Sequence, residues 1–587
     1  MASPSSEPVS TQVLSGNSTI TSPAEPQDNI THPEREGKVQ VEEPSTFQHS
    51  WRVWCIFLVL CLLSFISAVD ATIVTTSLPT ITREIGGAEQ YAWIANSFVF
   101  ASTVPQPLFG QISNIFGRRN PMLLAIFLFA VGSGLAGGSR NPGMLITGRT
   151  IQGLGTGGLY VLSDIIICDI VPPHHRGPYL SAVLSTAAIG TTIGPIIGGA
   201  LAQVQWRWIF WLNLPISGIG LFAILLFLNV QYKRSPTWRH ALARVDFLGN
   251  IIFVPSMVSI FLGLIMGGTQ YPWGSWHIIV PLVLGVLGWV AFFVHQASPI
   301  CKEPSTPPRL FKHRTSAAGF IIIFLGAIIL QAIAYFLPIY FQAVKGTSPL
   351  MSGVYFLPFA LAIIPFGGVT GVFMSKTGLY IPLHWLGFVM SAIGAGLLST
   401  LNESSSKAAW IGFQILSSGG TGIVFTATLP STLAALRESD VAVATGTYSF
   451  IRSFGLVWGV TMASIVFNGQ VNKNIDSIGD AAIRLTLANG AAYSYSSGGL
   501  ISSLPPNTKK EVINLYVQAL RAVWLVMAAV SCLGFFCVFI EKHVELRKDH
   551  TTEFGLAESK HKTTLDVEEG PNLTTEERKA LSISSSR

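Results

Sequence analysis

Apolar segments of about 20 residues recur along most of this chain, and no other feature restricts its fold as strongly. A helix of roughly this length crosses the hydrocarbon core of a bilayer, and it satisfies its backbone polar groups without water. We place fourteen predicted spans near residues 53–76, 91–113, 121–138, 143–168, 179–203, 208–230, 247–268, 276–297, 317–341, 350–374, 380–400, 408–434, 441–466 and 519–541. Only 11% of the 587 residues are charged, against about 25% in soluble domains. The sequence therefore predicts an all-α integral membrane protein.

An internal repeat divides these spans into two halves. Gly110 and Gly117 lie seven residues apart in "GQISNIFGRR", between spans two and three. Gly371 and Gly378 have the same spacing in "GVFMSKTG", between spans ten and eleven. These are corresponding points of two six-span halves, and transporters built of repeated halves bind substrate between them near the midplane.

The repeat, together with the polar ends of the chain, sets the predicted organisation. We expect two six-helix bundles with a pair of linking helices between them, an outer loop near 467–518 and two disordered cytoplasmic tails. The predicted boundaries are 1–48 for the N-terminal tail, 49–230 for the first bundle, 231–298 for the linking helices, 299–541 for the second bundle and 542–587 for the C-terminal tail.

Lysine and arginine in the loops set the predicted orientation. Thirteen of them fall on one side of the spans and five in the short loops on the other, and the richer side faces the cytoplasm. An even number of spans then places both termini in the cytoplasm. Asn402, in the sequon "NES", falls in an outer loop, so we expect it to be a glycosylation site.

The sequence argues against several classes of function. The net charge of +6 is spread along the chain, without the basic stripe of a nucleic-acid-binding protein. The six cysteines form no CxxC and no cluster with zinc-ligand spacing, so we expect no metal and no cofactor. There is no HExxH, GxSxG or phosphate-binding loop motif, which argues against an enzyme or an ATP-driven pump. A channel would not need two matched halves.

Several motifs resemble those of the major facilitator superfamily, over nearly all of residues 50–541. "GQISNIFGRR" resembles its cytoplasmic loop signature, "LITGRTIQGLGTGG" its fourth-span motif and "GTTIGPIIGG" the fifth-span motif of its antiporters. "DATIVTTSLP" and "WRWIFWLNLP" resemble the fourteen-span drug:proton antiporter branch, and "IICDIVPPHHRG" is similar to fungal members that export toxins and drugs. The residues that the resemblance singles out are Gly110, Asn114, Gly117, Arg118 and Arg119 at the cytoplasmic gate, Arg149 in span four, and Gly190, Gly194, Pro195, Gly198 and Gly199 in span five.

The resemblance implies a function. It implies a proton-coupled secondary active transporter that exports small, mostly amphipathic compounds by alternating access. We expect a monomer in the plasma membrane, or in the vacuolar membrane as the alternative location, with protons, a small-molecule substrate and the bilayer as its partners. A second possibility within transporters is proton-coupled uptake or vacuolar import of basic amino acids or iron chelates. Localisation and the direction of flux separate the two.

The loop signature departs from the family pattern at two positions. Asn114 stands where the family usually has aspartate, and Ile115 where it often has a basic residue, which weakens the case for a charge relay at this gate. Asp169, at the inner end of span four, is the expected partner of Arg118 and Arg119. A gate that only holds the helices together and a gate that signals both remain open.

Asp70 is the most unusual residue of the first span. A charge at bilayer depth costs about 2.5–3.5 kcal/mol on insertion scales. Counted from the ends of spans one and four at 1.5 Å per residue, Asp70 and Arg149 both lie roughly 9 Å below the outer membrane edge. We therefore expect the two to pair. Two interpretations stay open: Asp70 gains and loses a proton during transport, or it is a static partner of Arg149.

Further residues are candidates for a substrate cavity. Asp164 lies near the inner end of span four, where it lines an inner vestibule or meets water. Arg452 lies near the middle of span thirteen, where a substrate contact and a bond to backbone carbonyls are equally consistent with the sequence. The complete set of cavity candidates is Asn96, Asp164, Gln331, Tyr335, Gln342, Phe356 and Arg452. Glycines at every fourth residue in span five, from Gly190 to Gly198, predict a surface for close helix packing.

Overall fold

The computed structural model describes residues 51–86, 91–229, 237–268, 270–488, 492–495 and 500–546. The predicted N-terminal tail, 1–48, and the C-terminal tail beyond Leu546 lie outside these residues. Within them the chain is helical, and the β-structure amounts to one isolated bridge between Gly267 and Tyr271. The prediction of an all-α membrane protein is thus confirmed.

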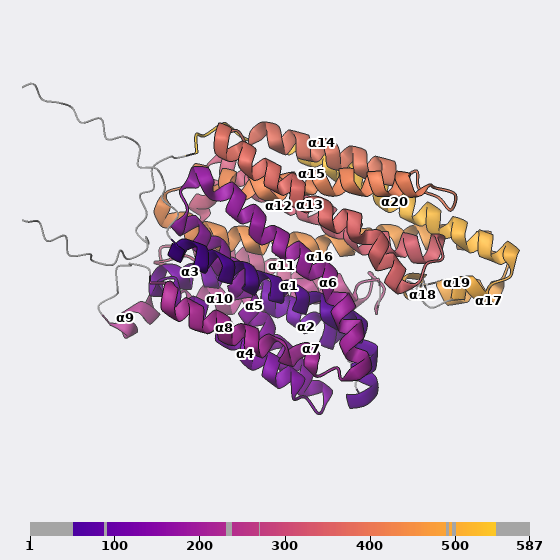
Figure 1. Ribbon diagram of the computed structural model, residues 1–587, viewed down its shortest axis with the longest axis horizontal. Coiled ribbons are helices and arrows are strands. Elements are labelled where there is room, and N and C mark those ends of the chain that lie inside the picture. The colour runs from indigo at the N-terminus through magenta and orange to yellow at the C-terminus, as the bar shows by residue number, and fades with distance from the viewer. Residues whose placement is uncertain are drawn as a thin grey trace, which may run out of the picture. The chain divides into compact units, whose positions relative to one another are not determined.

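The N-terminal half consists of helices that pack mainly on one another (Figure 1). Helix α1 packs along α6, α4 along α5, α2 on α5, and α8 on both α1 and α4. Helix α1 continues well beyond the predicted end of the first span at residue 76. The elements are α1 (Trp51–Ile85), α2 (Tyr91–Thr103), α3 (Gln106–Phe116), α4 (Arg119–Gly137), α5 (Pro142–Ile170), η2 (Pro173–His175), α6 (Arg176–Val204), α7 (Trp208–Trp211) and α8 (Asn213–Phe227).

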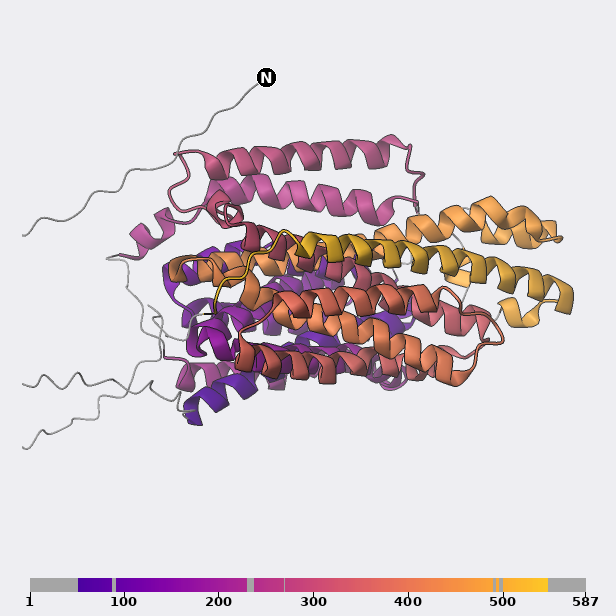
Figure 2. The same ribbon diagram turned by 90° about the horizontal axis from the view of Figure 1, so that it is seen from above.

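A short connection and two long helices follow. Helices α10 and α11 pack against each other as an antiparallel pair at one side of the bundle (Figure 2), and α10 also contacts α16. Most of the outward side chains of α11 are apolar and exposed, among them Val283, Leu287 and Val294, as suits a surface against lipid. The elements are α9 (Trp238–Ala243), α10 (Phe247–Met266) and α11 (Trp276–Ala297).

In the C-terminal half, α12 packs on α15, α16 and α20, α16 also packs on α20, and α14 packs between α15 and α20. The described residues of the predicted outer loop near 467–518 are largely helical, with α16 and α20 extending into it and short helices between them. The elements are η3 (Pro308–Phe311), α12 (Arg314–Ile339), η4 (Tyr340–Val344), α13 (Pro349–Thr377), α14 (Ile381–Leu398), α15 (Lys407–Ala434), η5 (Glu438–Asp440), α16 (Val441–Asn474), η6 (Ile475–Ser477), α17 (Ala481–Leu487), α18 (Ala492–Tyr495), α19 (Leu500–Ser503) and α20 (Pro506–Val538).

The second predicted span, 91–113, is interrupted. Helix α2 ends at Thr103 and α3 begins at Gln106, with Pro105 between them. Proline lacks the backbone N–H of a helix interior and its ring clashes with the preceding turn. Among the described residues, thirteen helices are therefore continuous, long and apolar enough to cross a membrane. The pair α2–α3 occupies the place of the remaining predicted span.

The segment after α20 folds back onto the C-terminal half. Glu541 lies 2.8 Å from His384 of α14, and both side chains are fully buried. The hydroxyl of Tyr380 accepts the backbone N–H of Val544 at 2.7 Å, and Arg314 donates to the carbonyl of Ile540 at 2.6 Å. The first residues of the predicted tail, up to Leu546, are therefore part of the fold.

Candidate functional site

Asp70 and Arg149 form a buried ion pair inside the N-terminal half. Arg149 Nη1 lies 2.5 Å from Asp70 Oδ2, and neither side chain is more than 2% exposed. The other carboxylate oxygen accepts hydrogen bonds from Gln152 and Asn213, each at 2.8 Å. One carboxylate thus joins three helices, α1, α5 and α8, and Ser133 attaches α4 to the same network. These partners offset much of the free-energy cost of removing the charged Asp70 carboxylate from water.

The network continues around the arginine. Arg149 donates to Gln152 at 2.8 Å, and its guanidinium lies 4.1 Å from the centre of the Phe98 ring. A planar guanidinium can donate hydrogen bonds in its plane and stack with its face at the same time. The expected pairing of Asp70 with Arg149 is therefore present, with Phe98 and two amide side chains completing it.

A cavity of about 290 Å³ lies between the two halves. Its walls come from α1, α5 and α6 on one side and from α12, α13, α15 and α16 on the other. Leucine, valine and phenylalanine side chains make up much of the lining, including Phe356, Phe359 and Phe425. Polar groups converge from both halves: Ser64, Tyr160, Asp164, Thr191, Thr192, Gln331, Thr426, Tyr448, Arg452 and Ser453. Such a mixture is typical of small-molecule sites.

Asp164 and Arg452 are the charged residues of the cavity wall. They face each other across the two halves, with Arg452 Nη2 3.4 Å from Asp164 Oδ2. Ser449 adds a long hydrogen bond of 3.5 Å to the same oxygen. The Arg452 side chain remains 22% exposed and the Asp164 side chain 10%. This pair is looser and more accessible than the pair of Asp70 and Arg149, so a ligand in the cavity can reach it.

The structure separates the two carboxylates. Asp70 is 0% exposed and does not line the cavity, whereas Ala68 on the same helix does. Asp70 therefore does not face the cavity in this conformation.

Of the seven cavity candidates, the structure brings four to the cavity: Asp164, Gln331, Phe356 and Arg452. Asn96 lies on α2 outside its lining. Tyr335 stacks on Tyr493 of α18, with ring centres 5.0 Å apart. Gln342 lies in the π-helical turn η4, beyond Pro338, and donates to Ser352 at 3.3 Å. These three residues do not line this cavity.

At the predicted cytoplasmic end, the gate residues form a compact group. Arg118 Nε lies 2.6 Å from Asp169 Oδ2, with both side chains buried. Arg118 also donates to the side-chain oxygen of Asn114 at 3.0 Å. Asp169 is thus the partner of Arg118, as expected, whereas Arg119 donates to the carbonyl of Leu225 on α8 at 2.7 Å.

The repeated glycines close the two halves against each other at this end. A Cβ atom on Gly110 of α3 would lie 2.8 Å from the carbonyl oxygen of Ala442 on α16. A Cβ atom on Gly371 of α13 would lie 2.8 Å from the carbonyl carbon of Gly177 on α6. In each case a second-span helix of one half meets the fifth-span helix of the other.

The second glycine of each repeat ends its helix. Gly117 follows α3 with φ of 77°, and Gly378 follows α13 with φ of 70°, a conformation that favours glycine. Close to the first of these helix ends, Asn114 donates to the carbonyl of Ser439 at 3.4 Å. In the same region Arg176 lies 3.5 Å from Glu438, so polar contacts reinforce the closure.

The glycine motif of span five packs on α1, as its spacing predicts. A Cβ atom on Gly190 would meet the carbonyl oxygen of Phe65 at 2.6 Å, and one on Gly194 would meet the Thr72 hydroxyl at 2.1 Å. Pro195 lies inside α6. Gly199 has open space around it. Close packing on α1 is thus observed at Gly190 and Gly194, and Gly198 is a buried residue of the same helix.

Sequence reasoning missed the partners that complete both sites. Gln152 lies three residues after Arg149, on the same face of α5; this spacing could have revealed it. Asn213 follows the tryptophan-rich turn into α8, and only the packing of α8 on α1 brings it to Asp70. Tyr160 and Tyr448 lie four residues from Asp164 and Arg452, so the helical period predicts them once those charges are placed.

Comparisons with known proteins agree with this architecture. The model of the family described as the Major Facilitator Superfamily matches residues 60–460. The chain is 48% identical to the MFS efflux transporter aclA of Aspergillus oryzae over 530 residues, which cover 90% of this chain and 96% of that protein. It is 43% identical to the efflux pump FUS6 of Gibberella moniliformis, over 90% of this chain and 94% of that protein.

The solved structures with this fold are more distant. The human organic anion transporter MFSD10 aligns with a TM-score of 0.53 at 16% identity, over 83% of this chain and 99% of that one. The proton:xylose symporter XylE aligns with a TM-score of 0.50 at 15% identity, over 80% of this chain and 100% of that one. They agree with a fold of two helical bundles. The chain therefore belongs to the major facilitator superfamily, and it is a multi-pass membrane transporter rather than an enzyme.

Proposed function

We propose that this chain exports small amphipathic compounds from the cell by exchanging them for protons. The observation that carries the proposal is the cavity between the halves, with the pair of Asp164 and Arg452 in an otherwise largely apolar wall. Export is supported by the relatives, which are named efflux transporters or pumps and are similar over nearly their whole length. The plasma membrane and a monomeric state are part of the proposal.

The cavity favours a compound with an apolar body and one or two polar groups. Phenylalanine and leucine side chains offer contact area, and the tyrosines, threonines and Gln331 offer hydrogen bonds at a few fixed points. Because the carboxylate and the guanidinium of the pair are both accessible, either end can hold a ligand of opposite charge. Neutral ligands leave the pair intact.

For proton coupling we propose Asp70. It is the central acceptor of a network that joins α1, α4, α5 and α8 through Arg149, Gln152, Ser133 and Asn213. A proton on this carboxylate would weaken the ion pair and replace one accepted hydrogen bond by a donor. The four helices could then adopt a second arrangement, as alternating access requires. Because this conformation excludes solvent from Asp70, the proton would enter only when the half opens.

Asp164 is the second candidate for the coupling residue. Its contact with Arg452 is 3.4 Å long, and its side chain keeps 10% exposure to the cavity. Substrate and proton could therefore compete for it directly. In this version the network around Asp70 is a structural tie between helices, and only Asp164 changes its protonation state.

Exchange in reconstituted vesicles distinguishes these possibilities. A susceptibility and accumulation screen, in cells with and without the protein, first identifies a transported compound. Its proton-driven exchange is then measured for the wild type, Asp70→Asn and Asp164→Asn across a range of pH. We expect Asp70→Asn to insert and to bind the compound weakly, because it removes a buried charge at nearly the same shape, but to lose the dependence on the proton gradient.

Each outcome has a defined meaning. Wild-type rate and pH dependence in Asp70→Asn, with loss of coupling in Asp164→Asn, would move the coupling site to Asp164. Transport by the wild type that persists in a protonophore at constant ATP would contradict proton coupling altogether. Net uptake of the compound into cells, in place of extrusion, would contradict export.

A further inference from the structure

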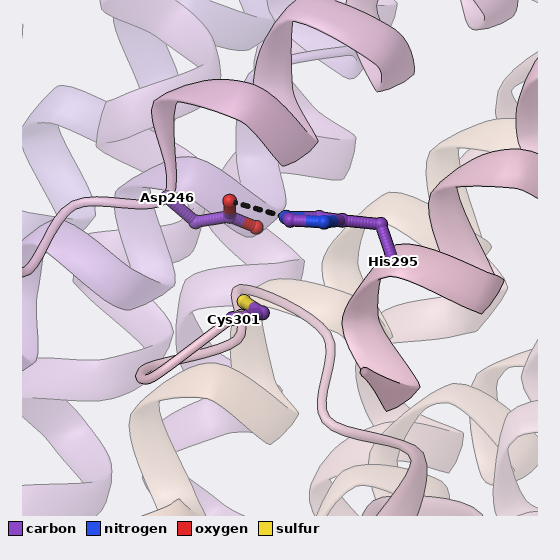
Figure 3. Close-up of side chains that lie close together, drawn as sticks. All are labelled: Asp246, His295 and Cys301. Carbon is purple, nitrogen blue, oxygen red and sulfur yellow. Dashed lines mark hydrogen bonds and ion pairs between the residues drawn. The ribbon is translucent and has the colours of Figure 1, made fainter. Parts of the chain in front are cut away.

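Three potential metal ligands meet at the predicted cytoplasmic end of the linking helices (Figure 3). Asp246 precedes α10, His295 is in the last turn of α11 and Cys301 is in the loop that follows. Their ligand atoms all lie within 4.8 Å of one another, and Asp246 Oδ1 is 2.9 Å from His295 Nε2. Asp246 is buried, and the other two residues are half-buried.

We propose that Asp246, His295 and Cys301 bind one Zn²⁺ ion, with water as the fourth ligand. Thiolate, imidazole and carboxylate are the ligands that zinc prefers, in tetrahedral geometry. At the usual bond lengths, a sulfur and a nitrogen ligand lie roughly 3.5 Å apart. The three side chains therefore need to move by only about 1 Å to surround an ion. One carboxylate and one thiolate balance the charge of the ion.

Binding exchanges protons for the metal. The thiol of Cys301 releases its proton to solvent, and its sulfur donates an electron pair to Zn²⁺. His295 coordinates through Nε2 and carries its proton on Nδ1. Asp246 gives up the hydrogen bond to His295 and offers the same oxygen to the ion. The half-buried positions of His295 and Cys301 give the ion and its water a route from solvent.

Neighbouring groups already hold the carboxylate in place. The backbone N–H of Gly249 donates to Asp246 Oδ1 at 2.9 Å, and the side chain of Gln296 donates to Oδ2. The carbonyl oxygen of the same Gln296 side chain accepts the N–H of Thr306 at 3.1 Å. The loop that carries Cys301 is thus fixed to α11 on its far side. Such second-layer hydrogen bonds orient the ligands of metal sites.

The location of the three residues suggests that a bound ion would stabilise the packing of the linking helices beside the gate. The backbone N–H of Asp246 donates to Gln111 of α3 at 3.4 Å, and Gln111 directly follows Gly110, which closes the gate against α16. A bound ion would tie α10, α11 and the loop that follows α11 together beside this gate. Sequence spacing could not reveal the site, because Asp246 and His295 are 49 residues apart and meet only when α10 and α11 form a hairpin.

Co²⁺ is a suitable spectroscopic probe, because it replaces Zn²⁺ and gives a thiolate charge-transfer band in the ultraviolet and visible bands in tetrahedral sites. We would use the full chain, purified in detergent without a polyhistidine tag and stripped with a chelator. The wild type should bind one Co²⁺ per chain with both kinds of band, and Zn²⁺ should displace it. Elemental analysis of the protein reloaded with Zn²⁺ gives the stoichiometry independently.

Variants test the cysteine and histidine ligands without disturbing the helix cap that Asp246 provides. Cys301→Ser should lose the charge-transfer band, and His295→Gln should lose tight binding. Gln296→Ala keeps all three ligands and should weaken binding roughly tenfold or more. Cys55→Ser is the matched control, a half-buried cysteine of α1, and should behave as wild type. Absence of both bands in the wild type, or an unchanged charge-transfer band in Cys301→Ser, would overturn the proposal.

Discussion

Asp164 of the N-terminal half and Arg452 of the C-terminal half lie 3.4 Å apart in the wall of the central cavity. Because the two residues belong to different halves, their contact depends on how the halves are arranged. The pair can therefore report both the conformation of the transporter and the charge of its ligand.

This position leads to a prediction about ligand selectivity. Asp164→Asn leaves Arg452 as an uncompensated cation in the cavity, so anionic compounds should bind better and cationic ones worse. Arg452→Gln should have the opposite effect. We expect about tenfold in each direction, the worth of a hydrogen bond to a charged group. Binding of matched anionic, neutral and cationic analogues to purified protein checks this, and equal changes for all three analogues would contradict it.

At the buried pair, geometry should matter more than charge. Arg149→Lys keeps the positive charge but loses the planar group that contacts Asp70, Gln152 and Phe98 together. We expect it to reduce proton-driven exchange by tenfold or more, because lysine cannot reproduce both the in-plane bonds and the stacking. Asp70→Glu, which moves the charge by one methylene group, should retain partial activity. Transport by Arg149→Lys at the wild-type rate would show that charge alone suffices.

The glycine contact at the gate gives a conformational prediction. Gly371→Ala places a methyl group 2.8 Å from backbone atoms of Gly177 and Pro178, so it should destabilise the closed cytoplasmic gate by about 1–3 kcal/mol. Gly368→Ala on the same helix meets nothing within 4 Å and is the control. A cysteine at Leu184, which lines the cavity, should react faster with an impermeant reagent from the cytoplasmic side only in Gly371→Ala.

Glu84 gives a prediction for pH. The hydrogen bonds from Arg207 at 2.6 Å and from Trp206 at 2.7 Å lower the pKa of this carboxyl group below its ordinary value. A lowered pKa in the folded state contributes stability above the unfolded pKa of about 4.3, and this stability disappears as the pH falls through the folded pKa. The side chain is 49% exposed, so the effect should stay below about 1 kcal/mol.

Thermal unfolding of wild type and Glu84→Gln measures this contribution. Near neutral pH the wild type should unfold at a slightly higher temperature than Glu84→Gln, and this difference should shrink towards acid pH. A difference that grows in acid would mean that Glu84 is not stabilised in its charged form.

The places and order of the membrane spans could be predicted because each span is a long apolar run, and the bilayer leaves the backbone few alternatives. The pairing of Asp70 with Arg149 followed from counting equal helical rises along spans one and four. Which face of each helix meets the cavity could not be predicted in this way. Gln331 and Tyr335 share a face of α12 by their spacing, yet only Gln331 lines the cavity, and Tyr335 stacks on Tyr493 of α18. Helices that are apolar all round give no periodic signal for which side chain meets the cavity.

Breaks within helices could not be predicted from the sequence patterns either. Pro105 divides the second span, whereas Pro195, Pro255 and Pro281 stay inside continuous helices. A proline weakens a helix locally, and the packing around it decides whether the helix continues. Likewise, the turn η4 redirects Gln342 towards Ser352, an outcome that depends on how α12 meets α13.

The buried contact between His384 and Glu541 determines how the chain can be shortened or extended. A truncation after Val538 removes Glu541 and leaves the buried imidazole of His384 without its carboxylate. It also removes the backbone groups of Val544 and Ile540 that form hydrogen bonds with Tyr380 and Arg314. Affinity tags and fluorescent fusions should therefore start after Leu546, even though the last helix ends at Val538. A reporter attached directly to α20 would measure the damage caused by its own attachment.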